Sequence, residues 1–248
     1  MVFGLAVLAN THFIGYNGVN WDTTGQVGWR SSSIHPRRIF DFALNGNGIK
    51  GDGTVHSNMI DGDPPPAPGQ GEFLTMAISS TLSMSLANPR GGTVPGGHWV
   101  EFSFNQVYPV SEMWLWNYNE NGSFNGSGGG MNYPANQWTA QGMREVTIQA
   151  TAVGGGGGGN WGSDDPADWN TVFTGEIPQA LGRPEEPASL VVNFGGIHVR
   201  YVVITTSADL RRVNWIVNAG MSGYTDAGLA EARFFKIPEN EGTVLFVR

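Results

Sequence analysis

Residues 99–104, which read WVEFSF, are the stretch that decides the fold. Val100, Phe102 and Phe104 are apolar, and Glu101 and Ser103 stand between them. Successive side chains of a β-strand point to opposite faces of the sheet, so this alternation predicts a half-buried strand. The stretch therefore indicates a fold built from sheet.

The same β rhythm continues along the rest of the chain, where turn-rich stretches separate further runs and no helical period of useful length appears. The predicted strands are residues 112–118, 144–151, 170–174, 189–194, 200–206 and 229–237. The 37 Gly and 14 Pro supply turns, and charged residues make up only 14% of the chain, below the roughly 25% usual for soluble domains. We predict an all-β fold, an antiparallel β-sandwich with long Gly-rich loops.

One hydrophobic core is expected for a chain of 248 residues. We divide the sequence into an N-terminal apolar segment and lead-in strand at 1–27, the sandwich at 28–237, and a C-terminal extension strand at 238–248. Residues 1–9 (MVFGLAVLA) end in small residues, as a secretory signal does, but no Lys or Arg precedes them. A signal remnant and a first buried strand both remain open, and the run is too short to span a bilayer.

Composition excludes several classes of function. Thirteen Lys and Arg against 21 Asp and Glu give a formal net charge of −8 with no basic run, which argues against a nucleic acid partner. The absence of cysteine removes disulfides, thiolate metal sites and a cysteine nucleophile. The five His show no short zinc spacing, and the sequence contains no GxSxG motif and no P-loop. We therefore predict a protein that is not an enzyme.

Three separated stretches carry a resemblance to a known family. They are residues 200–205 (RYVVIT) with 228–235 (GLAEARFF), residues 98–104 with 112–119 (EMWLWNYN), and residues 43–57 (ALNGNGIKGDGTVHS). Together they resemble the discoidin family, also called the F5/8 type C domain, which includes many carbohydrate-binding modules, and the variant is similar to secreted bacterial proteins. The resemblance covers roughly residues 28–237. It implies a discoidin-like jelly roll, a location outside the cell or at its surface, and sugar binding without catalysis.

The resemblance also implies a structural calcium ion between the early loop and the last strand. The matching positions are Asn45, Asp52, Thr54 and Glu231, whose oxygens suit this metal. Asn45 stands where the family usually has Asp, which removes one charge from the set. The alternative is that Asn45 and Asp52 cap turns by bonding to their own backbone.

Aromatic side chains in loops are the candidate sugar contacts, because sugar rings stack their C–H faces on exposed indole or phenol rings. The candidate ligand-binding residues are Tyr133, Trp138, Trp161 and Trp169, with Arg30, His56 and Arg211 as hydrogen-bonding partners. For each of them the alternative is a loop side chain that folds back onto the sandwich. By contrast, the stripe of Trp114, Trp116 and Tyr118 is predicted to be sandwich core.

Carboxylates in pairs are what a glycosidase requires, and the sequence offers only neighbouring acids in exposed-looking loops. These acids, which we expect to be solvated, are Asp164, Asp165, Asp168, Glu185 and Glu186.

A carbohydrate-binding module is therefore the leading hypothesis, with a glycan or polysaccharide as partner. The alternative is a self-assembling extracellular structural subunit, a filament or sheath, whose apolar ends at 2–9 and 243–247 (TVLFV) complete a neighbour's sheet. Both ends could also pair within their own domain.

Overall fold

A computed structural model describes residues 12–14, 27–31, 49–50, 55–56, 76–78, 98–119, 138–155, 161–183, 185–216 and 227–237. Within these ranges the chain consists of antiparallel strands, loops and three short 3-10 helices, and no α-helix occurs. None of the described helices is long and apolar enough to cross a membrane. The predicted all-β class is confirmed.

Eight strands form one antiparallel sheet, and three short ones form a second. The large sheet contains β1 (His12–Ile14), β2 (Val27–Ser31), β5 (Met76–Ile78), β6 (Trp99–Asn117), β7 (Glu145–Thr151), β8 (Asn170–Glu176), β10 (Leu190–Thr206) and β11 (Ala227–Lys236). The small sheet contains β3 (Ile49–Lys50), β4 (Val55–His56) and β9 (Glu186–Pro187). The 3-10 helices are η2 (Trp138–Gln141), η3 (Pro166–Asp168) and η4 (Leu210–Arg212).

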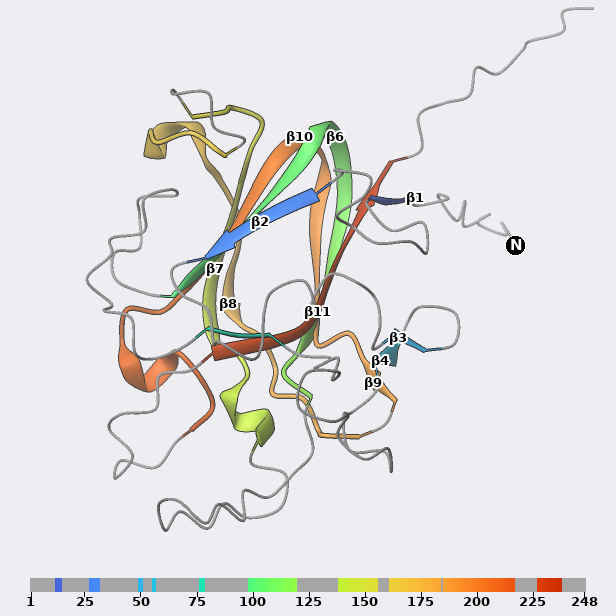
Figure 1. The fold of residues 1–248 in the computed structure, drawn as a ribbon, viewed down its shortest axis with the longest axis vertical. Coiled ribbons are helices and arrows are strands. Elements are labelled where there is room, and N and C mark those ends of the chain that lie inside the picture. The colour runs from blue at the N-terminus through green and yellow to red at the C-terminus, as the bar shows by residue number, and fades with distance from the viewer. Residues whose placement is uncertain are drawn as a thin grey trace, which may run out of the picture.

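Two long strands, β6 and β10, turn the large sheet into a sandwich. Residues 99–104 of β6 pair with β2 on one side and with the end of β10 on the other. Residues 110–117 of β6 pair instead with β11 and with the first part of β10. Register shifts on β10 mark the bend between the two halves, and both strands arch together at the top of Figure 1. The single ladder therefore folds into two layers.

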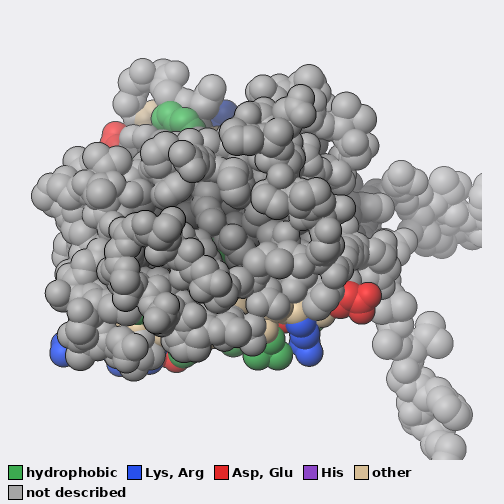
Figure 2. All heavy atoms as spheres, turned by 60° about the horizontal axis from the view of Figure 1, so that its bottom comes forward, with side chains coloured by type: hydrophobic (Ala, Val, Ile, Leu, Met, Phe, Trp, Pro, Cys, Tyr) green, Lys and Arg blue, Asp and Glu red, His purple; other side chains and the backbone are tan. Residues whose placement is uncertain are grey.

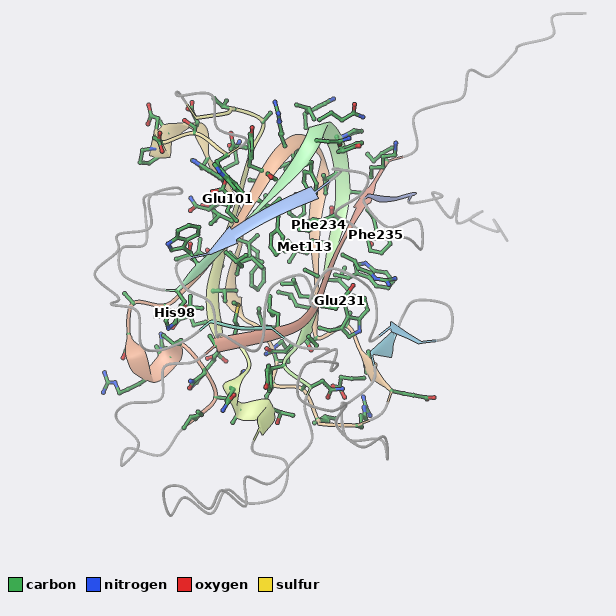
Figure 3. All side chains as sticks on the ribbon, in the orientation of Figure 1. His98, Glu101, Met113, Glu231, Phe234 and Phe235 are labelled. Atoms are coloured by element: carbon green, nitrogen blue, oxygen red, sulfur yellow. The ribbon has the colours of Figure 1, made fainter. Side chains whose placement is uncertain are left out.

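We call the layer that contains β2, β7, β8 and residues 99–104 of β6 the first layer. The layer that contains β1, β5, β11 and residues 110–117 of β6 is the second layer. The ring of Phe234 in β11 lies 5.2 Å from that of Phe102 and 5.0 Å from that of Phe104, both on β6. Phe234 and Met113 are fully buried between the layers (Figure 3). These contacts locate the core between the two halves of the sheet.

All seven predicted strands exist, but two pairs of them are continuous. Residues 99–104 and 112–118 lie together on β6 apart from the final residue, and 189–194 and 200–206 lie on β10 apart from the first. Sequence alternation breaks at residues 105–109 (NQVYP), yet pairing resumes there through Tyr108↔Val199 and Pro109↔His198. The polar interruption marks a bend, and the strand itself does not end.

The prediction that residues 99–104 form a half-buried strand is wrong in one respect, because both faces of the strand are buried. Glu101 is fully buried and Trp99 and Ser103 are nearly so, although they point away from the core. The reason is tertiary: the loop between β7 and β8 covers this outer face, as the bond from Gly162 to Glu101 shows.

The N-terminal region contributes directly to the sandwich, since β1 pairs with β11 from His12↔Lys236 to Ile14↔Phe234. The predicted segments at 1–9 and 238–248 lie outside the described residues. The alternative of assembly through apolar ends therefore stays a prediction.

Phe234→Ala is expected to lower the free energy of unfolding by about 3–5 kcal/mol, because it leaves a cavity between the layers. Phe235→Ala is the matched control, since this neighbouring ring lies on the other side of β11 and is only partly buried. Urea denaturation followed by circular dichroism measures both. An equal or larger loss in the control would contradict the two-layer arrangement.

Candidate functional site

The predicted loop residues do not gather at one end of the sandwich. The loop between β7 and β8, which carries Trp161, Trp169 and η3, lies at the top of Figure 1. Trp138 begins η2 at the bottom, and the backbone N–H of Trp215 donates to Ala140 O at 2.8 Å, which ties η2 to the segment after η4. Trp138 therefore lies at the end opposite the other two tryptophans.

The β7–β8 loop is anchored to the first layer by a buried carboxylate. Glu101 Oε1 accepts the backbone N–H of Gly162 at 2.7 Å, and Glu101 is fully buried (Figure 3). A Cβ atom at position 162 would lie 2.5 Å from the ring of Trp169, so only glycine fits there. Charge-assisted hydrogen bonds of this kind are stronger than neutral ones. The loop is held where it crosses the sheet.

Trp169 packs against Gly162 and helps to hold the loop on the sheet. Its side chain is 6% exposed and packs in a second apolar cluster with Trp99, Tyr201 and Val203 on the outer face of the first layer. Its Nε1 donates to Ser163 O at 3.0 Å. The Trp169 ring therefore packs the loop onto the sheet, which is the alternative that the sequence left open for it, and its contact with a ligand stays a prediction.

Trp161 lies one residue before the anchor and remains partly exposed. Its carbonyl accepts the N–H of Gly155 at 2.8 Å, and Ser163 N donates to Val153 O at 3.0 Å. Gly154 and Gly162 form an isolated bridge between these two contacts. The backbone on either side of Trp161 is thus fixed by hydrogen bonds. Of the two tryptophans in the described part of this loop, Trp161 is the one whose side chain is partly exposed.

The remaining predicted contacts are spread over the molecule. Arg211 in η4 is 89% exposed and bonds to Asp209, at 3.1 Å from Nε to Oδ1. This side-chain hydrogen bond lowers the pKa of Asp209 and raises that of Arg211. Arg30 is opposite Glu101 in the register of β2 with β6, and His56 is opposite Glu186 in that of β4 with β9.

Tyr133 and the side chains of Trp138, Arg30 and His56 lie outside the described part of the chain. Blue and red side chains of described residues both appear along the lower edge of Figure 2.

The expectation of solvated acids holds for Asp164, Asp165 and Glu185, which are exposed, but fails for Glu186. Glu186 is buried, accepts Leu181 N–H at 3.2 Å and pairs with Arg183 at 2.9 Å. It therefore shapes the loop at 181–186.

Two of the predicted acids, the exposed Asp165 and the partly buried Asp168, form hydrogen bonds within the β7–β8 loop. Asp165 accepts Ala167 N–H at 2.9 Å and caps η3, while Asp168 accepts the hydroxyl of Ser163.

Glu231 is the member of the predicted calcium set that the structure describes. It is fully buried on β11, and Arg233 Nε donates to its Oε1 at 3.5 Å (Figure 3). A buried carboxylate requires positive charge or strong donors nearby, and Arg233 supplies such a charge here. Asn45, Asp52 and Thr54 lie outside the described residues, and the described part contains no group of three or more ionisable metal ligands.

Trp114 differs from its predicted place in the core. Trp116 and Tyr118 are fully buried, but Trp114 is half-buried on the outer face of the second layer. Its ring lies 4.9 Å from that of Phe235, and its Nε1 donates to Glu112 at 2.9 Å. The sandwich core takes the opposite face of the same strand, with Met113 and Leu115. The alternation of both strands could have indicated this pairing of outer aromatics.

Comparison with known proteins gives matches only among solved structures. No family model matches the chain, and no curated protein matches it. A family 32 carbohydrate-binding module from Clostridium perfringens NanJ, in complex with galactose, is 12% identical over 91% of this chain and 99% of that chain, with a TM-score of 0.45. A second such module, from a family 31 glycoside hydrolase of the same organism, is 12% identical over 86% and 92%, with a TM-score of 0.42.

A family 89 glycoside hydrolase from Clostridium perfringens, in complex with GlcNAc-alpha-1,4-galactose, is 11% identical over 91% of this chain, with a TM-score of 0.40. The chain spans only 15% of the length of that enzyme.

Gly162→Ala is expected to destabilise the protein by about 1–3 kcal/mol, because the added methyl group overlaps the Trp169 ring. Trp169→Phe removes the two ring atoms that clash, so the double variant should be more stable than the sum of the single effects. Thermal unfolding of all four proteins measures the coupling. Strict additivity would show that Gly162 and Trp169 do not touch.

Proposed function

We propose that this chain is a non-catalytic extracellular carbohydrate-binding module that recognises a glycan or polysaccharide through loop aromatics and polar side chains. The observation that carries the proposal is the geometry of Trp161. Its ring is partly exposed, while hydrogen bonds from Gly155 and Ser163 and the anchor at Gly162 hold the backbone around it. The sequence resemblance to discoidin domains supports the same function.

A fixed aromatic ring suits sugar binding for a thermodynamic reason. Sugar C–H faces stack on an indole, but ordering a mobile loop upon binding would offset much of the gain. Next to Trp161, the buried hydrogen bond from Gly162 N–H to Glu101 already fixes the backbone. The free energy of stacking is then available for affinity, which we expect to be modest for a single ring.

Trp161→Ala is expected to weaken glycan binding by at least about tenfold, or about 1.4 kcal/mol, and to leave the melting temperature within about 2 °C. Trp114→Phe is the matched control, since Trp114 is also a half-buried tryptophan but lies on the second layer. Glycan arrays identify ligands, with galactose and GalNAc among the first sugars, and calorimetry measures the affinities. Unchanged binding by Trp161→Ala would remove this residue from the site.

We further propose that Glu231 contributes a ligand to a structural calcium ion. The support is its complete burial on β11, near the residue 227–229 segment that pairs with β5. Arg233 already places one positive charge beside this buried carboxylate, and calcium would add direct coordination of its oxygens. The bound ion would stabilise the folded chain, because the unfolded chain does not preserve the site.

Calcium at about 100 times its dissociation constant should stabilise the wild-type protein by about 2.7 kcal/mol, and a chelator should reverse this gain. Glu231→Gln should lose the calcium-dependent increment, whereas Glu112→Gln, a control on the outer face of β6, should keep it. Thermal unfolding with and without calcium measures the difference. A melting temperature of the wild type that ignores both calcium and chelator would refute the metal site.

A further inference from the structure

The arginines of the described part of the chain differ in one respect. Five of the six described arginine side chains pair with a carboxylate within 4 Å, whereas Arg200 does not. The five pairs are Arg144–Glu176, Arg183–Glu186, Arg211–Asp209, Arg212–Glu145 and Arg233–Glu231. Arg200 is half-buried, and its Nε is a buried donor with no hydrogen-bond partner.

The position of Arg200 in β10 is irregular. It lies at a register shift, between Val199, which pairs with Tyr108, and Tyr201, which pairs with Ser103. Such bulges redirect a side chain out of the ordinary alternation of a strand. The guanidinium carbon of Arg200 lies 5.4 Å from the centre of the Tyr201 ring. The planar cation is therefore held against an aromatic ring, which restricts its orientation.

Tyr201 connects Arg200 with the candidate sugar-binding loop. The ring of Tyr201 packs in the same apolar cluster as Trp169, and its hydroxyl lies 3.2 Å from where a Cβ of Gly154 would stand. Gly154 in turn bridges to Gly162, the neighbour of Trp161. Arg200 and Trp161 thus flank one packed unit, at the end of the sandwich where the β7–β8 loop lies.

A half-buried arginine without a carboxylate partner indicates the kind of ligand that it would bind. Burying part of a guanidinium without a counter-ion costs free energy, and a buried donor without an acceptor adds to that cost. A carboxylate or sulfate bound at the solvent-facing side of the guanidinium would supply the missing counter-ion, since the arginine fork matches planar and tetrahedral oxyanions. The chain has a formal net charge of −8, yet none of the acids in the described ranges forms an ion pair with Arg200. The geometry points to Arg200 as the anion-binding residue of a site for acidic saccharides, a specificity that rests on the proposed function.

Replacement of Arg200 by methionine tests this inference, because the variant keeps the long apolar stem and removes the fork. Arg200→Met should weaken binding of acidic saccharides by about tenfold or more and leave neutral ones unchanged. Its melting temperature should stay the same or rise, since the variant removes a buried unsatisfied donor. Arg212→Met is the matched control for charge, because Arg212 is exposed and lies at the η4 end. It should bind every saccharide as the wild type does.

Three classes of oligosaccharide distinguish the outcomes: oligouronates, sulfated galactans and neutral galactans, each measured by calorimetry at about 0.15 M salt, where fields are screened beyond about 8 Å. Binding of oligouronates or sulfated galactans that falls in Arg200→Met supports the inference, and the stronger class identifies the anionic group. Wild-type protein that binds none of the three overturns the proposed function.

Other outcomes overturn the inference alone. Wild-type protein that binds all three classes with equal affinity, or an Arg200→Met variant that loses neutral and acidic ligands alike, would show that Arg200 does not select an anion. The same holds if the arginine-dependent binding is to vesicles that contain anionic lipid and to no saccharide.

Discussion

The pairing of β6 with β10 is the constraint on which the rest of the structure depends. It runs from Leu190↔Leu115 to Thr205↔Trp99 and passes through the bend without changing partner. Beyond its last pair, Thr206 and His98 exchange backbone and side-chain hydrogen bonds at 2.8 and 2.9 Å. Because β6 and β10 run through both layers, the distance between the layers is set by the side chains that pack between them. Phe102 and Phe104 meet Phe234 there, and the remaining strands add to edges that this ladder defines.

Buried polar side chains then fix the loops at both ends of the sandwich. At one end Glu101 holds Gly162 and thereby the residues beside Trp161. At the other end Asn117 Nδ2 donates to Met143 O at 2.8 Å and to Pro178 O at 2.9 Å, while Asn119 bonds both Gly182 and Arg183. Each of these side chains forms hydrogen bonds with backbone N–H or C=O groups that strand pairing leaves without a partner. Such backbone groups can be buried only when they are hydrogen-bonded. Loops of irregular sequence are therefore positioned by a few buried side chains of the sheet.

The distribution of charge follows the same logic. Most described arginines neutralise an acid close by, as Arg183 does with Glu186 and Arg233 with Glu231, so their charges serve local structure. Arg200 has an aromatic neighbour instead and retains its capacity to bind an anion. The half-buried Trp161 and this cation flank the same packed unit around Tyr201. The proposed anion site therefore uses a different arginine from those that pair with acids within the fold, and burial and partners tell the two kinds apart.

The sequence by itself determined the all-β class and the seven predicted strands. Alternation with period two is a local property of 99–104 and of the strands that pair with it. The sequence also identified Trp161 as a loop aromatic, close to the six consecutive glycines at 154–159. Tertiary structure alone decided that 99–104 and 112–118 form one strand, that Glu101 is buried, and that Trp169 packs while Trp161 stays partly exposed. These outcomes depend on which distant segment covers a given face, as the loop after β7 covers Glu101. No local pattern contains that information, so Arg200, which sits inside the RYVVIT strand, could be distinguished from other arginines only by its missing partner in space.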